Sequence, residues 1–504
     1  MFIKPGMFLS RRGGILLAAG FLGLALAGCG GGGGGGAPAP VTVSIGAPVG
    51  LGNSPISKIS FPVILSGPAN GPLTVNYATA DEVGATGGAA CAAGVDYVQV
   101  ANGTLTIPSG ASGGAIEISV CNPAAFADAV ALRVTLTGVS VNGLISSAAK
   151  ISYGLIGAQS VGILNDSGAA QCSNGTALTA CPVADFPGQD AGNGRDVAVL
   201  LNTDADGRKG FAFAKLGDAK AVLSASTTPW KCVQDNVTGL TWEAKTDVNK
   251  AVTMNWADAN TYVTTVSNAA LCGYIDWRLP TPQELASLLD NSISWTTTTT
   301  AVTDQTFFPD QQRATYWSAQ DASATGAATG RWAVDFQFGM TVIEETTALK
   351  HVRLVRGAVA APSYAAPESQ TVKDEKTGLT WRQCADGLSG DACATGAALA
   401  YTWQDALKRV VTINQAGFAG FKDWRLPNRN ELASIVEYTR NNPALNTARF
   451  VGFPLPGGVA PNFWTSTPYA ADPTKAWSVG FKDGEVVFSS VSNPRYVLLV
   501  RGGQ

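Results

Sequence analysis

The sequence predicts a multidomain protein in which an all-β sandwich is followed by two α+β domains. Residues 41–167 alternate apolar and polar side chains in short runs split by Gly, Pro, Asn and Ser, which is the pattern of an antiparallel sandwich. The second half of the chain carries one set of motifs twice, and the two sets lie about 145 residues apart. A period of this length is too long for a solenoid, so each copy is expected to be a complete domain with its own core.

The N-terminal residues predict export and a membrane anchor. A basic start is followed by an apolar stretch, residues 15–26, which is too short to span a bilayer stably. Residues 26–29, Leu-Ala-Gly-Cys, resemble the lipobox of bacterial lipoproteins; the alternative is an ordinary signal peptide with a Cys near its end. The resemblance implies that residues 1–28 are removed and that Cys29 carries the lipid, with residues 29–40 as a Gly-rich tether. Since Gly rather than Asp follows the cysteine, we expect a surface-exposed lipoprotein of the outer membrane.

The cysteines predict local disulfides. Nine are present, and setting Cys29 aside leaves eight that fall in neighbouring pairs, as is typical of an oxidising compartment. Zinc binding is the alternative, but no pair has CxxC spacing and the chain contains one histidine. The expected bridges join Cys91 to Cys121, Cys172 to Cys181, Cys232 to Cys272, and Cys384 to Cys393.

The composition argues against several classes of partner. Charged residues make up 14% of the chain and the formal net charge is -3, which loss of the three basic residues of the signal lowers to about -6. Such a surface has no general attraction for nucleic acid or for sulfated polyanions, so we expect no nucleic-acid partner. No other apolar run approaches the length of a membrane span, which leaves the lipid on Cys29 as the only predicted link to a membrane.

Short alternating segments predict an Ig-like sandwich in the first module. The expected strands are Val41–Ser44, Ile59–Leu65, Leu73–Ala78, Gly103–Ile107, Ala115–Val120, Ala131–Thr137 and Ser160–Leu164. Four motifs in this region resemble the Calx-beta family and occur in the same order as in that family. They are Val75–Asp81, Ala93–Tyr97, Gly103–Pro108 and Gly162–Asp166. The resemblance implies calcium bound by carboxylates at one end of the sandwich.

The calcium ligands expected from this resemblance are incomplete. The family has a Glu before its first long strand and an acidic run before a later one, whereas this chain has Gly52–Pro55 and Pro123–Asp128 at those places. The remaining candidate ligands are Asp81, Glu82, Asp96 and Asp166. Because Ca²⁺ needs six to eight oxygens with several negative charges among them, a depleted site is expected to bind calcium weakly or not at all. The alternative is a spacer whose aspartates cap loops, and no cofactor is required.

Each copy in the second half follows the same order of elements. A strand ending in Thr-Gly-Leu-Thr-Trp precedes a helix, an Asp-Trp-Arg-Leu-Pro loop, a second helix with capping-box spacing and several short strands, which together predict an α+β domain. We expect copy 1 with an N-terminal extension at 168–357, a linker at 358–369 and copy 2 at 370–504. The matching residues, first in copy 1 and then in copy 2, are Trp242 and Trp381, Asp276–Pro280 and Asp423–Pro427, Glu284 and Glu431, Trp317 and Trp464, and Arg356 and Arg501.

These motifs closely resemble the Lcl C-terminal domain family over roughly residues 183–503. The resemblance implies a C-type-lectin-like fold for each copy and an extracellular role in binding or adhesion. Function does not follow from a fold alone, so the residues have to decide it. The Ala- and Pro-rich linker predicts two tandem domains that bind bivalently, which raises avidity without any new contact.

Few residues are candidates for catalysis. The single histidine, His351, is matched by Tyr496 in copy 2, so an imidazole base cannot be common to both copies. Asp276 with Glu284, and the equivalent pair in copy 2, are the candidates for acid/base cleavage of a glycoside. Helix capping already accounts for the Glu, and the Asp is well placed to hold the neighbouring Arg. We therefore predict that the protein is not an enzyme, and a glycan-processing enzyme remains the second alternative.

The candidate ligand-binding residues are Trp277, Arg278, Trp317, Trp424, Arg425 and Trp464. Two interpretations are open. In the first, both arginines are buried against carboxylates and Trp rings and fix the loop from within. In the second, they face a ligand and the Trp rings stack on a sugar. The predicted function is adhesion or the binding of glycans or extracellular matrix, and a structural envelope spacer without a ligand is the first alternative.

Overall fold

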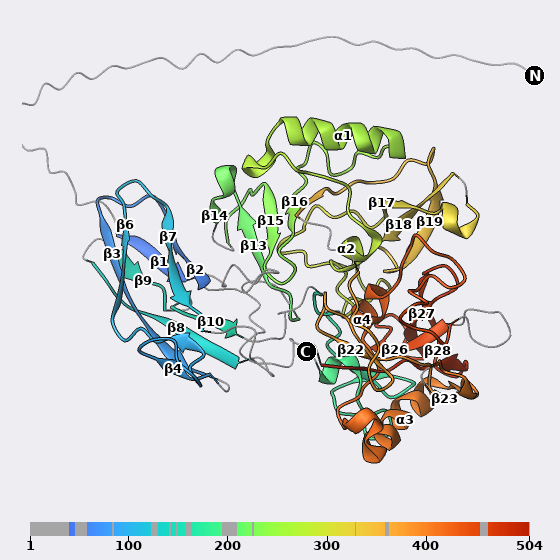
Figure 1. Ribbon diagram of the computed structural model, residues 1–504. Coiled ribbons are helices and arrows are strands. Elements are labelled where there is room, and N and C mark those ends of the chain that lie inside the picture. Colours follow the sequence, from blue (N-terminus) through green and yellow to red (C-terminus); the bar gives the residue numbers. More distant parts are fainter. Residues whose placement is uncertain are drawn as a thin grey trace, which may run out of the picture. The chain divides into compact units, whose positions relative to one another are not determined.

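The structure of the chain is a computed structural model, and Figure 1 shows its fold. The structure describes residues 40–45, 58–82, 85–121, 130–140, 143–147, 150–156, 164–193, 209–223, 226–327, 329–357, 362–390, 392–453 and 462–502. Contacts set Pro40–Gln504 apart as one compact unit. The predicted signal peptide, Cys29 and the glycines of the tether lie outside the described residues. None of the helices within the described ranges combines the length and the apolar character needed to cross a bilayer.

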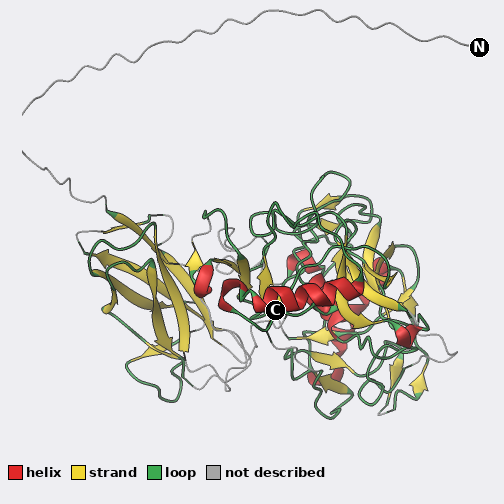
Figure 2. Ribbon diagram, turned by 90° about the horizontal axis from the view of Figure 1, so that it is seen from above, coloured by secondary structure: helices red, strands yellow, loops and turns green. Residues whose placement is uncertain are grey.

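The first module is a sandwich of two four-stranded sheets, ordered β7-β2-β1-β9 and β10-β8-β3-β6 (Figures 1 and 2). Its strands are β1 (Val41–Ile45), β2 (Lys58–Leu65), β3 (Leu73–Asp81), β6 (Gly103–Ile107), β7 (Gly113–Ser119), β8 (Val130–Val139), β9 (Gly143–Ile145) and β10 (Ile151–Ile156), with a small pair β4 (Gly87–Gly88) and β5 (Tyr97–Val98) beside them. Within the two sheets, β1 and β9 are parallel and the other neighbours are antiparallel.

The alternating pattern of the sequence builds the core of the sandwich. Val43, Ile59 and Phe61 are almost completely buried, and the residues between them along the strands are more exposed. Six of the predicted strands correspond to β1, β2, β3, β6, β7 and β8 with small differences at their ends. Strands β9 and β10 were not expected, and the predicted strand Ser160–Leu164 lies almost wholly outside the described residues.

Copy 1 contains the sheets β14-β13-β15-β16-β20 and β17-β18-β19 together with two α-helices. Its elements are β13 (Phe213–Leu216), β14 (Val222–Leu223), β15 (Cys232–Asp235), β16 (Thr241–Glu243), α1 (Trp256–Asn268), α2 (Pro282–Ala286), β17 (Thr315–Asp321), β18 (Gly330–Asp335), β19 (Thr341–Glu345) and β20 (Val355–Arg356). In both copies the final short strand lies beside the strand that carries the Thr-Gly-Leu-Thr-Trp motif. This pairing brings the end of each copy back to its beginning.

Copy 2 contains the sheets β21-β22-β30 and β25-β29-β26-β27-β28, again with two α-helices. Its elements are β21 (Thr371–Lys373), β22 (Thr380–Arg382), β25 (Ala400–Tyr401), α3 (Trp403–Ala416), α4 (Arg429–Ser434), β26 (Asn462–Pro468), β27 (Lys475–Gly480), β28 (Val486–Ser490), β29 (Arg495–Tyr496) and β30 (Val500–Arg501), with the small hairpin β23 (Leu388–Ser389) and β24 (Thr395–Gly396). The two copies together are rich in short strands and contain few helices, as Figure 2 shows.

The predicted capping boxes are present in both copies. The Thr281 hydroxyl accepts from the Glu284 N–H at 3.2 Å, and the Glu284 carboxylate accepts from the Thr281 N–H at 2.8 Å. Asn428 and Glu431 form the same reciprocal pair, with both distances at 2.8 Å. Each box satisfies amides that the first helical turn leaves without a partner, and it fixes the direction in which the Asp-Trp-Arg-Leu-Pro loop enters the helix.

The two copies pack against each other and share a hydrophobic core. The ring centroids of Trp332 in β18 and Tyr438 in copy 2 lie 4.8 Å apart, and both residues belong to one buried cluster. The N–H of Val486, the first residue of β28, donates to the hydroxyl of Thr341, the first residue of β19, at 2.9 Å. Because these positions are equivalent, the copies meet through matching faces, and helices α2 and α4 lie side by side (Figure 1).

Part of the predicted linker belongs structurally to copy 2. Tyr364 is buried, and its ring centroid lies 5.7 Å from that of Phe450. Its backbone also forms an antiparallel bridge with Asp374. The described part of the linker is therefore packed against copy 2, and it does not extend as a free spacer between two separate domains.

The extension segment, which we define as residues 169–193, packs on copy 2 although it precedes copy 1 in the chain. The ring centroids of Phe186 and Trp403 lie 5.8 Å apart. The Thr467 hydroxyl donates to the Asp190 carboxylate at 2.5 Å, and Asp190 is almost completely buried. We had expected this segment to extend copy 1, so its contacts correct that part of the predicted domain arrangement.

A difference between the copies explains this packing. In copy 1, the guanidinium of Arg331 lies 4.3 Å from the ring centroid of Trp256, the residue equivalent to Trp403. The position equivalent to Arg331 is Ala476, whose small buried side chain shares a cluster with Phe186 and Trp403. Arg331 thus covers in copy 1 the ring that Ala476 leaves open to Phe186 in copy 2.

Candidate ligand-binding site

The candidate tryptophans are internal. The exposed fractions of Trp277, Trp317, Trp424 and Trp464 are 4%, 0%, 2% and 0%. Their indole N–H groups donate to the carbonyl oxygens of Leu271, Met254, Phe418 and Tyr401, at 3.3, 2.9, 3.0 and 2.9 Å respectively. The prediction that these rings stack on a sugar is therefore wrong, because burial leaves no ring face free and the polar atom already has a partner.

The arginines of the Asp-Trp-Arg-Leu-Pro loops brace each copy from within. Arg278 donates two hydrogen bonds to Glu284 at 2.8 and 2.7 Å, and Arg425 donates two to Glu431, both at 2.6 Å. Each guanidinium also donates to the carbonyl that follows the last strand, at 3.0 Å in copy 1 and 2.7 Å in copy 2. We had expected the neighbouring Asp to hold the Arg. The capping Glu does so instead, while it also caps the helix, so both arginines are engaged in contacts within their own copy.

The motif aspartates pair with the arginines of the last strands. Arg356 donates to Asp276 through Nη2 at 2.8 Å, and Arg501 donates to Asp423 through Nε at 2.8 Å. The two Asp side chains are 53% and 56% exposed, so these pairs lie at the surface, unlike the braces beneath them. The hydrogen bonds from the arginines lower the pKa of both carboxyl groups. Each pair therefore presents a carboxylate and a guanidinium side by side.

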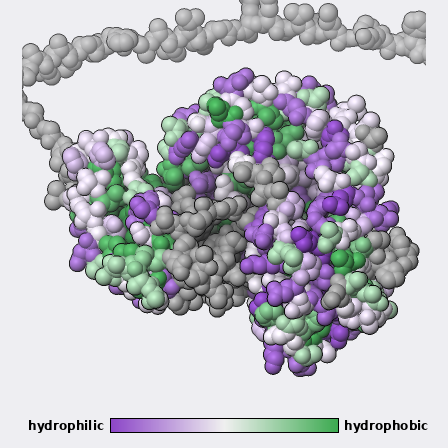
Figure 3. Space-filling model, in the orientation of Figure 1, coloured by the Kyte–Doolittle hydropathy of each residue, from purple (hydrophilic) through white to green (hydrophobic). Residues whose placement is uncertain are grey.

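An aromatic ring completes this arrangement in each copy. The guanidinium carbon of Arg356 lies 4.3 Å from the ring centroid of Tyr274, and that of Arg501 lies 3.8 Å from the centroid of Phe421. Both rings come two residues before the Asp of their motif, and Phe421 is 37% exposed. On the face drawn in Figure 3, hydrophilic and hydrophobic residues are interspersed over the two copies. We name these arrangements surface cluster 1 (Tyr274, Asp276 and Arg356) and surface cluster 2 (Phe421, Asp423 and Arg501).

The single histidine is built into the packing of copy 1. The ring centroids of His351 and Tyr316 lie 5.2 Å apart, and the two rings are stacked. Burial lowers the pKa of His351, which favours the neutral ring. Asp276 and Glu284 were considered from the sequence as an acid/base pair. In the structure each forms an ion pair with a different arginine, Asp276 with Arg356 and Glu284 with Arg278.

A comparison with known protein families identifies the duplicated half. A model described as the Lcl C-terminal domain matches residues 231–356 and 370–501, which together make up just over half of the 504 residues. The chain belongs to the Lcl C-terminal domain family. The two matches coincide with the copies that share the brace and the surface cluster, so we refer to the copies below as Lcl domains 1 and 2.

Solved structures resemble part of the chain. The structure entitled apo-form Calx CBD1 domain is 20% identical, with a TM-score of 0.18, and the match covers 23% of this chain and 96% of that one. The Calx CBD2 domain is 13% identical, with a TM-score of 0.19, over 23% of this chain and 87% of that one. The structure of CBD12 from CALX1.2 is 20% identical, with a TM-score of 0.18, over 23% of this chain and 43% of that one. No curated protein matches the chain.

The carboxylates proposed for calcium have other partners. Asp81 accepts from the Gly87 N–H and from the Tyr97 hydroxyl, both at 2.8 Å, and Glu82 lies 3.2 Å from Arg133. Two further candidates are separated in the fold. Asp96 accepts from the Thr86 N–H at 2.7 Å, whereas the carbonyl of Asp166 accepts from Asn430 of helix α4 at 3.1 Å. Throughout the described ranges no three His, Cys, Asp or Glu side chains gather as metal ligands.

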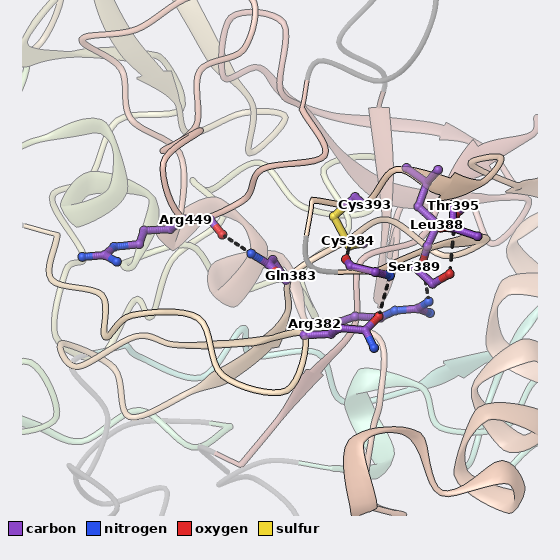
Figure 4. The surroundings of a disulfide bond; sticks show 10 residues. Arg382, Gln383, Cys384, Leu388, Ser389, Cys393, Thr395 and Arg449 are labelled. Carbon is purple, nitrogen blue, oxygen red and sulfur yellow. Dashed lines mark hydrogen bonds between the residues drawn. A yellow bond between two sulfur atoms is a disulfide. The ribbon is translucent and has the colours of Figure 1, made fainter.

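All four predicted disulfides are confirmed. They join Cys91 to Cys121, Cys172 to Cys181, Cys232 to Cys272, and Cys384 to Cys393. Figure 4 shows the last of these in Lcl domain 2, where Arg382 donates to the Leu388 carbonyl at 2.9 Å and Gln383 donates to the Arg449 carbonyl at 3.4 Å. The bridge therefore closes a loop that neighbouring side chains also hold in place.

Two buried polar networks were missed from the sequence. In Lcl domain 1, Lys245 donates to Glu243 at 2.9 Å and to the Tyr262 hydroxyl at 3.1 Å. At the matching place in Lcl domain 2, Asp386 accepts from Arg382 at 2.6 Å and from Arg409 at 2.8 Å. Their residues differ between the domains, so comparing the two copies gave no signal for them. The aromatic ring of each surface cluster was also overlooked, although its constant offset from the Asp was visible in the sequence.

Proposed function

We propose that the protein is a lipid-anchored cell-surface protein that binds glycans or extracellular matrix through its two Lcl domains, without catalysing a reaction. One observation carries the proposal. The motif residues that the domains share are either held in internal contacts or presented outward as an Asp–Arg pair beside an aromatic ring. A repeated surface of this kind suits recognition of a repetitive ligand, because two sites on one chain raise avidity.

Further features of the proposal concern fold and location. A C-type-lectin-like fold for each Lcl domain is supported by the family match and by the combination of two α-helices with short-stranded sheets in each copy. The lipid on Cys29 and a surface-exposed position in the outer membrane are supported by the lipobox and by the residue that follows it. Four disulfides suit an oxidising compartment outside the cytoplasm.

A role without catalysis is supported by the state of the ionisable groups in the shared motifs. Glu284 and Glu431 each accept two hydrogen bonds from an arginine and also cap a helix, so these two shared carboxylates are already engaged in internal contacts. His351 has no counterpart in domain 2. A structural spacer is the second candidate, and the extent to which the motif tryptophans and arginines brace the interior favours it.

Binding to a glycan array, together with attachment of cells that lack the gene, tests the proposal. Fragment 38–504 contains the whole of the compact unit Pro40–Gln504 and omits the expected lipid. We expect the fragment to bind a restricted set of glycans or matrix components, and we expect the deletion to reduce attachment. An array without signal, combined with unchanged attachment, would defeat the proposal in favour of a spacer. Turnover of a glycan by the purified fragment would instead support an enzyme.

A further inference from the structure

We infer that the two surface clusters are the binding sites of the Lcl domains and that each takes a vicinal diol of a neutral, hydroxyl-rich glycan. The inference rests on the proposed function and assigns it to particular residues. Three residue types stand at equivalent positions in both copies: an aromatic ring, an Asp two residues later, and the Arg of the last strand. Each Asp side chain is about half exposed. The Arg–Glu pairs of the braces, Arg278 with Glu284 and Arg425 with Glu431, are less exposed.

The ion pairs leave hydrogen-bonding capacity at the surface. Arg356 donates to Asp276 through Nε and Nη2, at 3.1 and 2.8 Å, and no hydrogen bond from its Nη1 is present in the part of the chain that the structure describes. Arg501 donates to Asp423 through Nε only, at 2.8 Å, so among the described residues both of its terminal nitrogens lack a protein acceptor. A guanidinium has five N–H donors, and a carboxylate accepts about four hydrogen bonds. Each cluster therefore retains donors and acceptors next to each other.

A vicinal diol fits such a pair. One hydroxyl accepts from the guanidinium while its neighbour donates to the carboxylate, so two adjacent hydroxyl groups use both charges at once. The aromatic ring supplies an apolar surface next to them, which suits the C–H groups of a sugar. Binding in this way replaces two hydrogen bonds to water on each side and orders few side chains, because Asp, Arg and ring already support one another.

Charge determines the class of glycan. Each cluster common to the domains carries one positive and one negative charge, and hydrogen bonds from the arginines lower the pKa of both aspartates, so both charges persist at neutral pH. An anionic substituent would be drawn to the Arg but repelled by the Asp that adjoins it. Both clusters have a lysine close by: Lys220 lies 4.7 Å from the ring centroid of Tyr274, and the exposed Lys422 stands between Phe421 and Asp423 in the sequence. Because the Asp and Arg that both copies share balance each other, we assign them a neutral ligand.

The test uses fragment 38–504 and matched Asp→Asn substitutions. Asp276→Asn and Asp423→Asn keep the side-chain shape but remove the charged acceptor from each cluster. Because the pairs are exposed, their loss is expected to change stability little, and thermal unfolding would verify this. We expect each single substitution to weaken binding to immobilised neutral glycans several-fold, and the double substitution to weaken it by about tenfold or more, since charged hydrogen bonds and avidity are both lost.

Two further variants serve as a matched control and as an independent test of the clusters. Asp247 and Asp472 also pair with lysines near the surface, one in each domain, so the double substitution Asp247→Asn with Asp472→Asn is the matched control and should retain binding. Replacing Tyr274 and Phe421 with Ala removes the rings that contact the two arginines but keeps the Asp and Arg side chains, and it should weaken binding as well.

The outcomes separate this inference from the proposed function. If the parent fragment binds neutral glycans and the Asp276→Asn, Asp423→Asn variant binds them equally well, the clusters are not the sites, although the proposed function stands. Binding confined to sulfated or uronic-acid glycans would overturn the ligand class. A parent fragment that binds no glycan would overturn both this inference and the glycan-binding form of the proposed function.

Discussion

Replacing Glu431 with Ala should destabilise Lcl domain 2 strongly, because one carboxylate supports two structures there. Its side chain is 4% exposed, accepts two hydrogen bonds from Arg425 at 2.6 Å and caps helix α4 at the Asn428 N–H. Removing one partner of a buried ion pair costs about 3–5 kcal/mol, and loss of the capping bond adds to this. Arg425 remains 15% exposed and so recovers some solvation, and we therefore expect about 3–4 kcal/mol in all.

Thermal unfolding of fragment 38–504 measures this effect. A change of 1 kcal/mol shifts the midpoint by about 2–4 °C for a unit of 150–250 residues, so the expected decrease is at least about 6 °C. The equivalent change in domain 1, Glu284→Ala, should cost less, because Glu284 and Arg278 are 14% and 24% exposed. Asp472→Asn weakens a partly exposed pair with Lys475 and should shift the midpoint by less than about 2 °C.

A compensated variant separates the charge effect from a general loss of packing. Replacing Arg425 with Met and Glu431 with Leu together removes both charges and keeps apolar volume, which typically costs little for a buried pair. We expect this double variant to unfold at a higher temperature than Glu431→Ala. If Glu431→Ala shifts the midpoint no more than Asp472→Asn does, the brace does not hold domain 2 together, and the argument from burial is wrong.

Three other predictions concern the remaining features of the fold. Ala476→Arg should place a guanidinium where Phe186 now packs, as in domain 1, and limited proteolysis should then cleave the extension segment faster than in the parent fragment. Burial raises the pKa of Asp190 to about 7, so the folded chain retains a proton that the unfolded chain releases, and stability falls as the pH rises from about 4 to 7. Asp190→Asn should therefore raise the unfolding midpoint at pH 8 more than at pH 5, and an equal effect at both would contradict the assignment. The Cys232–Cys272 bridge spans 40 residues, so replacing both cysteines with Ser should cost about 4 kcal/mol and more than the loss of either nine-residue bridge, as denaturant unfolding would show.

Features of the fold that depend on local sequence were predictable. Helix capping depends on residues three positions apart, and the pairs Thr281 with Glu284 and Asn428 with Glu431 were found as expected. The strands of the sandwich followed from alternation, and the disulfides joined cysteines that are neighbours in the sequence. Strand β9 was missed because it has three residues and pairs in parallel with β1, a contact that depends on a distant part of the chain.

Features that depend on tertiary contacts were harder to predict. The sequence contains Ala476 and Arg331 at matching positions, but only packing shows that this difference directs the extension segment to domain 2. The sequence also did not show which carboxylate binds Arg278, since Asp276 and Glu284 both lie close to it in the chain. In the structure Glu284 binds Arg278, and Asp276 binds Arg356. The candidate ligand residues were chosen because they recur in both copies. Recurrence identified the residues that the domain needs, and burial then separated the braces from the exposed pairs.

The motif residues of the Lcl domains divide into those that face inward and those that are expected to meet a ligand. Hydroxyl-radical footprinting with mass spectrometry measures this division residue by residue, in the free fragment and with a glycan bound. We expect the four tryptophans first considered as ligand residues, Trp277, Trp317, Trp424 and Trp464, to remain unmodified in both states. Tyr274 and Phe421 should be modified in the free fragment and protected by the glycan. Strong modification of the tryptophans that disappears on binding, with no protection at the two rings, would contradict this division.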